Sequence, residues 1–304
     1  MTIERFKSNT GLMILIYALL TLRSLFNRVI VRKNLNTGDR KSTTNNFLGY
    51  MEFCNQHIVT KIVTTSSAQQ ALEVGPGDNH SLALMIAAMG YQNVDTIDKY
   101  QVNYDDSSNF MLYEKISSHF QLDDWKALIK RVNRFDAKVD LRHLVSKKQN
   151  YYDLIYSVSV VEHLWPWRSQ MKLLTELLNN GGQMIHIINF TDHGMFSPIG
   201  NRFKFRKIPS FIYNLIMSPV GRPNRILPSD LIRFFENSNY QVGYKVIRTH
   251  TRVLLDKENY SINSIPQTEL SELLTEYKLD LEQDLDKILD SCIGSAVFTI
   301  RKNA

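Results

Sequence analysis

Two glycines and a later aspartate are the residues of this chain whose types and spacing most clearly predict chemistry. Gly75 and Gly77 flank Pro76 directly after an apolar run, so the backbone can turn tightly there and a ligand can approach it closely. Asp98 ends a second apolar run about 20 residues later, where a carboxylate can accept both hydroxyls of a ribose. The pattern predicts a site for an adenosine-containing cofactor.

The residues around the glycines favour a cofactor without phosphates. A dinucleotide places its pyrophosphate on the helix N-terminus, where a third glycine lets the helix pack close to the strand. Here that position is His80, preceded by Asp78 and Asn79, and an acidic turn is a poor seat for a diphosphate. S-adenosylmethionine carries a sulfonium and an amino acid tail instead, and Glu73 and Asp78 could face the ammonium of that tail.

A second group of polar residues follows the fourth and fifth predicted strands. It consists of Ser159, Glu162, His163, Asp192 and His193. Ligands of open α/β sheets lie beyond the carboxyl ends of the strands, so both parts of this group should border the reacting methyl group. We predict His193 as a general base supported by Asp192 or Glu162, with His163 as the second candidate. The alternative is that these side chains only cap helices or bind backbone.

Together these motifs resemble the class I S-adenosylmethionine-dependent methyltransferases, over roughly residues 68–248 and 295–302. Glu73-Val-Gly-Pro-Gly-Asp78 looks like their first motif, Val139-Asp140-Leu141 like the segment that reads adenine, and Val161-Glu162-His163-Leu164 like their EH signature. Asp136 is an alternative to Asp140 as the adenine contact. The resemblance implies that the cofactor is S-adenosylmethionine and that it contacts Glu73, Gly75, Pro76, Gly77, Asp78, Asp98, Asp140, Leu141 and Ser159.

A narrower resemblance concerns bacterial methyltransferases that accompany surface-glycan synthesis. The turn at 75–78, the pair Asp192-His193 and the later pair Asn224-Arg225 look similar to segments of those enzymes. This resemblance implies an acceptor that is a saccharide or a lipid-linked glycan.

The elements that must position these residues alternate at short intervals. We predict strands near 70–74, 93–97, 135–139, 152–158, 183–190, 241–248 and 296–300, and helices near 47–63, 81–89, 110–131, 167–180, 231–237, 267–278 and 279–291. This alternation predicts a parallel α/β sheet with right-handed crossovers. The helix near 231–237 should begin at Pro228 with Ser229 as its cap. The resemblance implies a Rossmann-like, seven-stranded class I methyltransferase sheet whose last strand is antiparallel beside the fifth.

We expect an N-terminal helix and linker at residues 1–46 and one methyltransferase domain at 47–304, with a lid insertion at about 192–228. Residues 1–33 hold six basic residues against Glu4 alone, and 195–228 hold six and no acidic one, so the net charge of +6 is regional. Aromatic residues alternate with the basic ones in the insertion, which could bind an anionic sugar or single-stranded nucleic acid. A helical cap with its own small core is a compatible alternative.

The apolar run at 11–22 is 12 residues long, too short for a membrane-spanning helix. Its leucines recur on one helical face, so the segment 11–33 could lie on a membrane surface beside anionic lipids. The alternative is a helix that packs on the protein's own surface.

Composition agrees with one cytoplasmic globular enzyme. The 304 residues are 43% hydrophobic, enough for a large core. Cys54 and Cys292 are too few for a disulfide framework or a zinc site, so we expect a reducing compartment, at most peripheral to the inner membrane face, and no metal.

The hypothesis from sequence is therefore O-methylation, dependent on S-adenosylmethionine, of an anionic small molecule, saccharide or lipid-linked glycan. Three alternatives remain: an RNA methyltransferase that uses the same basic insertion, a non-catalytic methyltransferase-like binding protein, and a nicotinamide-dependent dehydrogenase. The last is disfavoured by the acidic turn at Asp78.

Overall fold

A computed structural model gives the fold. It describes residues 10–29, 47–63, 69–99, 107–122, 124–135, 140–193, 204–238, 240–249, 254–257, 261–277 and 285–303. Its strands are β1 (Gln70–Val74), β2 (Asn93–Ile97), β3 (Val132–Arg134), β4 (Tyr152–Val158), β5 (Leu178–Asn189), β6 (Tyr240–Thr249), β7 (Leu254–Lys257) and β8 (Ile293–Lys302).

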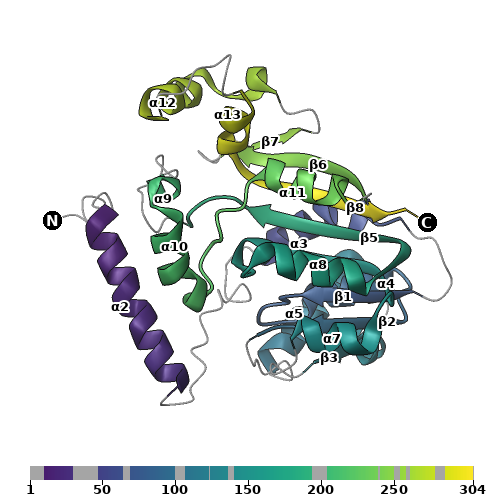
Figure 1. Ribbon diagram of the computed structural model, residues 1–304. Helices are drawn as coiled ribbons and strands as arrows, with labels where there is room; N and C mark the ends of the chain where they lie inside the picture. The colour runs from purple at the N-terminus through teal and green to yellow at the C-terminus, as the bar shows by residue number, and fades with distance from the viewer. Residues whose placement is uncertain are drawn as a thin grey trace. The chain divides into compact units, whose positions relative to one another are not determined.

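These strands form one mixed sheet in the order β3-β2-β1-β4-β5-β8-β6-β7 (Figure 1). The first five strands of the chain pair in parallel, with Glu73 of β1 opposite Thr96 of β2 and Tyr156 of β4. The central strand β4 is buried along almost its whole length, as expected for a parallel strand whose two faces are both covered by helices. The predicted α/β fold is confirmed.

The last strand has the predicted position and direction. Phe190 N at the end of β5 donates to Gly294 O at the start of β8, at 2.9 Å. Lys302 Nζ at the end of β8 donates to Leu178 O at the start of β5, at 2.8 Å. β8 therefore runs antiparallel to β5. The sheet also has an eighth strand, β7, which we did not predict and which pairs antiparallel with β6 at the edge.

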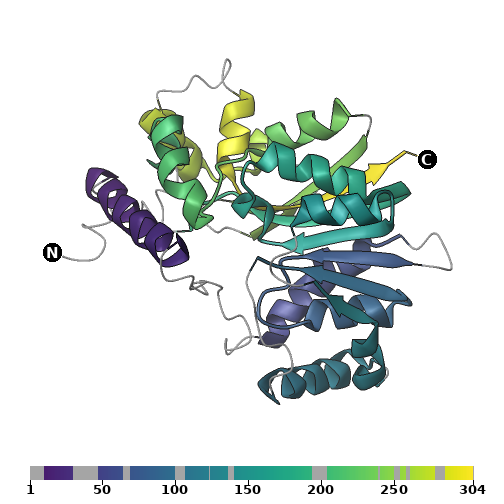
Figure 2. The same ribbon diagram turned by 60° about the horizontal axis from the view of Figure 1, so that its bottom comes forward.

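Helices follow most of the strands. They are α2 (Thr10–Val29), α3 (Phe47–His57), α4 (Ser81–Ala88), α5 (Ser107–Phe120), α6 (Trp125–Leu128), α7 (Leu141–Lys148), α8 (Trp167–Leu177), α9 (Lys204–Lys207), α10 (Ser210–Met217), α11 (Pro228–Glu236), α12 (Gln267–Tyr277) and α13 (Leu285–Cys292). Figures 1 and 2 show α8 on one face of the sheet and α3 on the other. Almost every residue of α4 is buried, because its small and apolar side chains face neighbours all round.

The chain divides into two compact units. The sheet unit comprises Asn34–Val160, Gln170–Ile187 and Thr299–Ala304, and the cap unit comprises Met1–Lys33, Val161–Ser169 and Ile188–Phe298. The glycine turn belongs to the sheet unit. Glu162, His163 and His193 belong to the cap unit.

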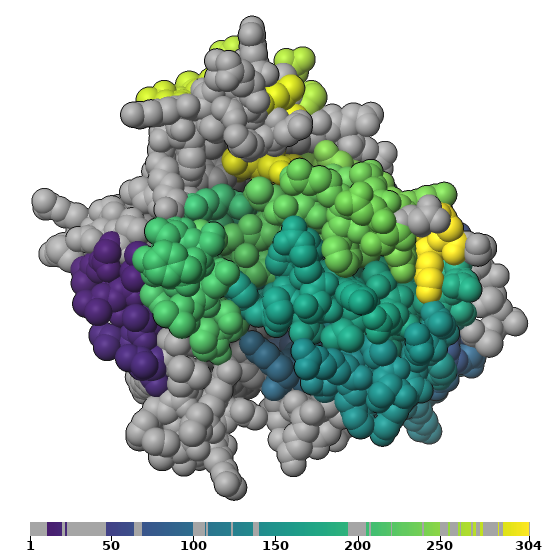
Figure 3. Space-filling model, viewed as in Figure 1, coloured from purple at the N-terminus to yellow at the C-terminus, as the bar shows by residue number. Residues whose placement is uncertain are grey.

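The helices α2 and α10 of the cap unit form a small apolar core of their own. Met13 of α2 is buried with Phe205, Ile208, Tyr213 and Met217 from the insertion. Figure 3 shows the two helices side by side, α2 in purple and α10 in green. Phe205 and Tyr213 of the insertion therefore belong to a small core, as the second alternative expected, and binding of a ligand by the insertion stays a prediction.

The outer face of α2 is apolar and open to solvent. Leu15, Leu19 and Leu22 are 56%, 57% and 62% exposed. Phe211 and Leu215 of α10 are each 74% exposed. Among the described residues, none of the helices is both long enough and apolar enough to cross a bilayer.

Several local predictions differ from the structure; for example, the helix expected near 110–131 is divided into α5 and α6. The third strand was expected at 135–139 but occupies Val132–Arg134, and residues 136–139 lie outside the described ranges. Ser229 does not cap α11: the N-cap position is Leu227, while Ser229 donates from its backbone N to Asp290 Oδ1 at 3.1 Å and from its hydroxyl to Asp290 Oδ2. Ser229, which the local pattern predicted as the helix cap, therefore binds a carboxylate that is distant in the sequence.

Candidate functional site

The glycine turn after β1 requires glycine at two positions for different reasons. Gly75 has φ +71° and Gly77 has φ +80°, a region that other residues rarely adopt. A Cβ built on Gly75 would lie 2.5 Å from Cγ2 of Val160, in the loop after β4. A Cβ on Gly77 would meet no atom within 4 Å. Gly75 thus permits close packing within the protein, whereas Gly77 leaves open space beside the backbone.

Asp98 lies at this turn, as the sequence spacing predicts. Its Oδ2 accepts a hydrogen bond from Gly77 N at 3.4 Å, and Gly75 N donates to Ile97 O at 2.8 Å. The end of β2 is therefore tied to the turn after β1. The Asp98 carboxylate thus lies beside Gly77, whose missing side chain leaves space, and a ribose with adjacent hydroxyls would need this arrangement.

The start of α4 fits a cofactor without phosphates. Asn79 Oδ1 accepts from Ser81 N at 3.0 Å, and the hydroxyl oxygen of Tyr113 accepts from His80 N at 3.0 Å. Two backbone N–H groups that could bind a phosphate at this helix start are thus already taken by protein acceptors. Asn109 Nδ2 also fixes the turn by donating to Asp78 O at 3.1 Å. The residues present fit S-adenosylmethionine better than a dinucleotide.

Glu73 is buried at the end of β1 and is held by Tyr156. The tyrosine hydroxyl donates to Glu73 Oε2 at 3.2 Å. Burial first, and Glu73 second, raise the pKa of Tyr156 well above its usual range, so the tyrosine stays a donor. Glu73 is thereby fixed two residues before Gly75, where the turn begins.

The other predicted cofactor residues have mixed surroundings. Asp140 is the N-cap of α7, and its Oδ1 accepts from His143 N at 2.9 Å. Leu141 is buried, and Ser159 has φ +54° with its N–H donating to Ile187 O at 2.8 Å. Their roles toward adenine and cofactor stay predictions, while Asp136 and Val139 lie outside the described residues.

His80 and His186 have local roles, as expected. Burial lowers the pKa of each to about 3, with Arg134 adding to the effect on His80. The ring of His186 hydrogen-bonds to the Ser157 hydroxyl through Nδ1 at 2.8 Å. Both histidines are therefore neutral at physiological pH.

In the cap unit, Glu162, His163 and His193 come together, and we call these three residues the Glu162 cluster. Glu162 Oε1 lies 3.8 Å from His193 Nε2, and their side chains are 1% and 28% exposed. The two imidazole rings are 5.0 Å apart and nearly perpendicular. His193 has φ +53°, an unusual backbone conformation for a residue with a side chain. The sequence predicted this grouping, and the role of His193 as a base stays a prediction.

Asn224 holds the turn that carries the cluster. Its Nδ2 donates to Val161 O at 2.8 Å and to Leu164 O at 2.9 Å, and its backbone N donates to Glu162 O at 2.6 Å. Its Oδ1 accepts from Ile226 N at 3.0 Å, so both ends of the amide are used. Sequence reasoning noted Asn224 only through a resemblance and missed this structural function.

Asp192, by contrast, acts on the tyrosines of the cap. It contributes, after burial, to raising the pKa of Tyr17 and of Tyr213. Its carboxylate is fully buried. Support of His193 by Asp192 stays a prediction, whereas Glu162 is the carboxylate whose distance to that histidine is short.

Two arginines of the insertion bind backbone. Arg225 Nη1 donates to Ile208 O at 2.7 Å and to Phe205 O at 3.1 Å, and burial lowers its pKa. Arg206 donates through Nη1 to Arg225 O and through Nη2 to Phe190 O, both at 3.2 Å. These two guanidinium groups stabilise the cap unit. The number of basic residues in the insertion therefore exceeds the number of basic side chains that an anionic ligand could bind.

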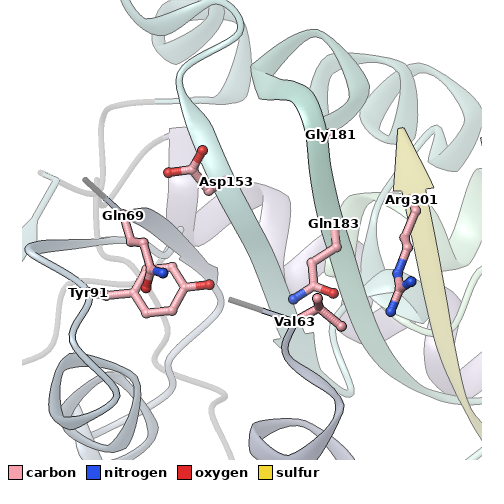
Figure 4. Close-up of a pocket in the computed structure, with 7 residues that line it drawn as sticks. All are labelled: Val63, Gln69, Tyr91, Asp153, Gly181, Gln183 and Arg301. Carbon is pink, nitrogen blue, oxygen red and sulfur yellow. The ribbon is translucent and has the colours of Figure 1, made fainter. Parts of the chain in front are cut away.

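A cavity of about 150 Å³ lies elsewhere in the sheet unit (Figure 4). Its walls include Gln69 just before β1, Tyr91 just before β2, and Asp153 at the start of β4. It lies at the amino ends of the parallel strands, whereas the glycine turn follows a carboxyl end. It is therefore separate from the candidate cofactor site.

No family model matches the chain, and no curated protein matches it. The solved structures that it resembles are distant. The cyclase SpnF is 12% identical, with a TM-score of 0.46 over 97% of this chain and 96% of that protein. Phosphoethanolamine N-methyltransferase 2 of Haemonchus contortus is 15% identical, with a TM-score of 0.47 over 93% of this chain and 60% of that protein.

A SAM-dependent methyltransferase of Archaeoglobus fulgidus is 13% identical, with a TM-score of 0.40 over 83% of this chain and 99% of that protein. Because these likenesses are weak, the description of the fold rests on the chain's own topology. The strand order, with β8 antiparallel beside β5, is that of the Rossmann-like class I methyltransferase fold.

Proposed function

We propose that the protein is an S-adenosylmethionine-dependent methyltransferase. The single observation that carries this proposal is the joined turn, in which Asp98 accepts from Gly77 N while the helix start offers its N–H groups to protein acceptors. Gly77 gives the cofactor room, Asp98 would bind the ribose, and Glu73 and Asp78 would face the ammonium of the tail. When bound, S-adenosylmethionine supplies an electrophilic methyl group.

We further propose a hydroxyl oxygen as the acceptor atom and the Glu162 cluster, with Asp192, as the residues that align and deprotonate it. A buried carboxylate beside two imidazoles supports this choice, because an attacking hydroxyl must lose its proton. The acceptor would be an anionic small molecule, a saccharide or a lipid-linked glycan near a membrane. The basic charge of the cap unit supports an anionic acceptor, reduced by the two arginines that bind backbone.

Calorimetry with S-adenosylhomocysteine and with NAD tests the cofactor. We expect the first to bind and the second not to bind. Asp98→Asn should weaken binding roughly 10- to 100-fold, because it removes a charged hydrogen-bond acceptor. Glu114→Gln, an exposed carboxylate change on α5, is the matched control and should leave the affinity unchanged.

The outcomes separate the alternatives. Binding of NAD without S-adenosylhomocysteine would favour a dehydrogenase and contradict the proposal. Binding without transfer of a labelled methyl group to any cellular fraction would favour a non-catalytic binding protein. Label transferred to RNA, and not to the glycan or small-molecule fraction, would favour an RNA methyltransferase.

A further inference from the structure

We propose that the Glu162 cluster is a binding site for a divalent first-row transition cation. Glu162, His163 and His193 each offer one ligand atom, and these atoms all lie within 4.8 Å of one another. Two imidazole nitrogens and one carboxylate oxygen are a ligand set that suits zinc, iron, cobalt or manganese. Magnesium and calcium prefer oxygen ligands and suit it less well. The binding of the cation is independent of the proposed function, and only its role in catalysis rests on that function.

One of the ligand–ligand distances is already close to that around a bound ion, and all of them lie within 4.8 Å. Ligand atoms around such an ion lie roughly 3 to 3.5 Å apart, given metal–ligand bonds of about 2.1 Å. Glu162 Oε1 and His193 Nε2 are already 3.8 Å apart. The side chain of His193 is 28% exposed and can rotate, whereas that of Glu162 is 1% exposed and is fixed in place. Closing the site therefore moves the exposed ligand toward the buried one.

A hydrogen bond sets the tautomer of His163 in the form that a metal requires. His163 Nδ1 lies 2.8 Å from Gly221 O, and because a carbonyl only accepts, Nδ1 carries the proton. Nε2 therefore keeps the lone pair that can bind a cation. Histidine ligands of metals characteristically donate their other ring N–H to a carbonyl or carboxylate, which fixes the ring. This hydrogen bond is a second observation in favour of a cation site, separate from the types of residue that form the cluster.

The backbone around the ligands is also held in advance. Asn224 donates to Val161 O and Leu164 O, on either side of Glu162 and His163. Preorganised ligands lose little conformational freedom when a cation binds. The site is thus a rigid turn with one adjustable histidine.

In catalysis, the cation would hold the acceptor hydroxyl at an open coordination position and lower the pKa of that hydroxyl. The oxygen–methyl bond forms as the sulfonium–methyl bond breaks, and the hydroxyl proton passes to water. The charge of the cation does not change, so no oxidant or reductant is needed. A bound cation would occupy the lone pair with which His193 could act as a base. In the cation-bound site the cation therefore replaces His193 in promoting loss of the hydroxyl proton, and the general-base role proposed for His193 applies to the cation-free site.

Cobalt(II) provides a direct test, because its visible absorption reports its coordination. Tag-free, full-length protein is treated with a chelator, dialysed, and titrated with cobalt(II) alone by absorption and calorimetry. We expect one equivalent per chain. Glu162→Gln and His193→Gln should each weaken cobalt binding about 10- to 100-fold. His143→Gln, a change at an exposed histidine of α7, is the matched control and should bind like the unmodified chain.

The affinity for S-adenosylhomocysteine reports the folding of each variant. Glu162 is buried and its variant could misfold, so His193→Gln, at a partly exposed position, provides the second reading. Absence of stoichiometric cobalt binding, or binding that survives both substitutions, would overturn the cation site. Cobalt binding without S-adenosylhomocysteine binding would contradict the proposed function and leave the cation site intact.

Discussion

The glycine turn of the sheet unit and the Glu162 cluster of the cap unit are built in opposite ways. The turn lies within a few residues of chain, and its conformation follows from two glycines and from a carboxylate 21 positions later. The cluster combines residues 162–163 with residue 193, and its turn is held by hydrogen bonds to the distant segment 221–224. Local backbone rules thus specify the first region, and long-range contacts specify the second.

The largest expected effect concerns the turn. Gly75→Ala adds a Cβ that would lie 2.5 Å from Val160 Cγ2 at a positive φ. We expect the free energy of unfolding to fall by about 3 kcal/mol, from overpacking and backbone strain together, with loss of S-adenosylhomocysteine binding. Urea denaturation and calorimetry measure both.

Gly90→Ala is the matched control, because Gly90 has φ +103° but no atom within 4 Å of an added Cβ. It should cost only the backbone strain. Val160→Ala should restore part of the stability in the Gly75→Ala background. Equal losses for the two glycine variants, without any rescue, would mean that close packing does not explain Gly75.

The second effect concerns the cluster. Asn224→Ala removes the donors to Val161 O and Leu164 O, and should lower the free energy of unfolding by about 2 kcal/mol. Cobalt binding should weaken while the affinity for S-adenosylhomocysteine stays the same. Asn237→Ala, at the exposed end of α11, is the control. If cofactor affinity fell as much as cobalt affinity, the two regions would not be independent.

The third effect concerns the two buried histidines of the sheet unit. The pKa of His80 and of His186 is about 3 when folded, below the value of 6.5 in the unfolded chain. The unfolded state therefore binds more protons between these values, and stability falls as the pH drops from 6.5 toward 3. The slope should approach ~1.4 kcal/mol per pH unit for each histidine.

Urea denaturation at several pH values measures this slope. His186→Gln should reduce it by the contribution of one proton, because the amide can still bond to Ser157. A slope that is unchanged in this variant would show that His186 is not the group responsible.

The smallest expected effect concerns the exposed apolar face of α2 and α10. We propose that this face contacts an anionic membrane surface, since its leucines are exposed and the sequence of residues 1–33 carries a basic excess. Leu19→Glu together with Phe211→Glu should weaken binding to mixed phosphatidylcholine and phosphatidylglycerol vesicles about fivefold. Vesicle co-sedimentation measures this, and Met111→Glu, which is 67% exposed on α5, is the control. Equal binding by all variants would contradict membrane contact through this face.

The sequence predicted regions with strong local signals best. β2 and β4 have the bounds that their apolar runs predict, and the turn residues lie together as their spacing indicates. β3 was misplaced because it is short and largely exposed at the sheet edge, so it has little apolar pattern. The residues of the Glu162 cluster were found, but their fixation by Asn224 was not.

The arginines of the insertion show why long-range contacts could not be foreseen. Arg206 and Arg225 have the same types and spacing as residues that bind an anionic ligand, and only the structure shows that they donate to backbone carbonyls. A charge pattern does not distinguish a ligand from a carbonyl oxygen several turns away. The roles of such residues can be assigned only from the folded structure.

The insertion of β8 between β5 and β6 has a consequence for synthesis of the chain. The ribosome completes β5 more than 100 residues before it completes β8, so for that interval β5 and, once it is made, β6 lack the strand that lies between them. Both strands then have an open edge that other chains could pair with. Synthesis of β8 is therefore the event that closes the sheet, and a nascent chain stopped before Ile293 should depend on chaperones to stay in solution.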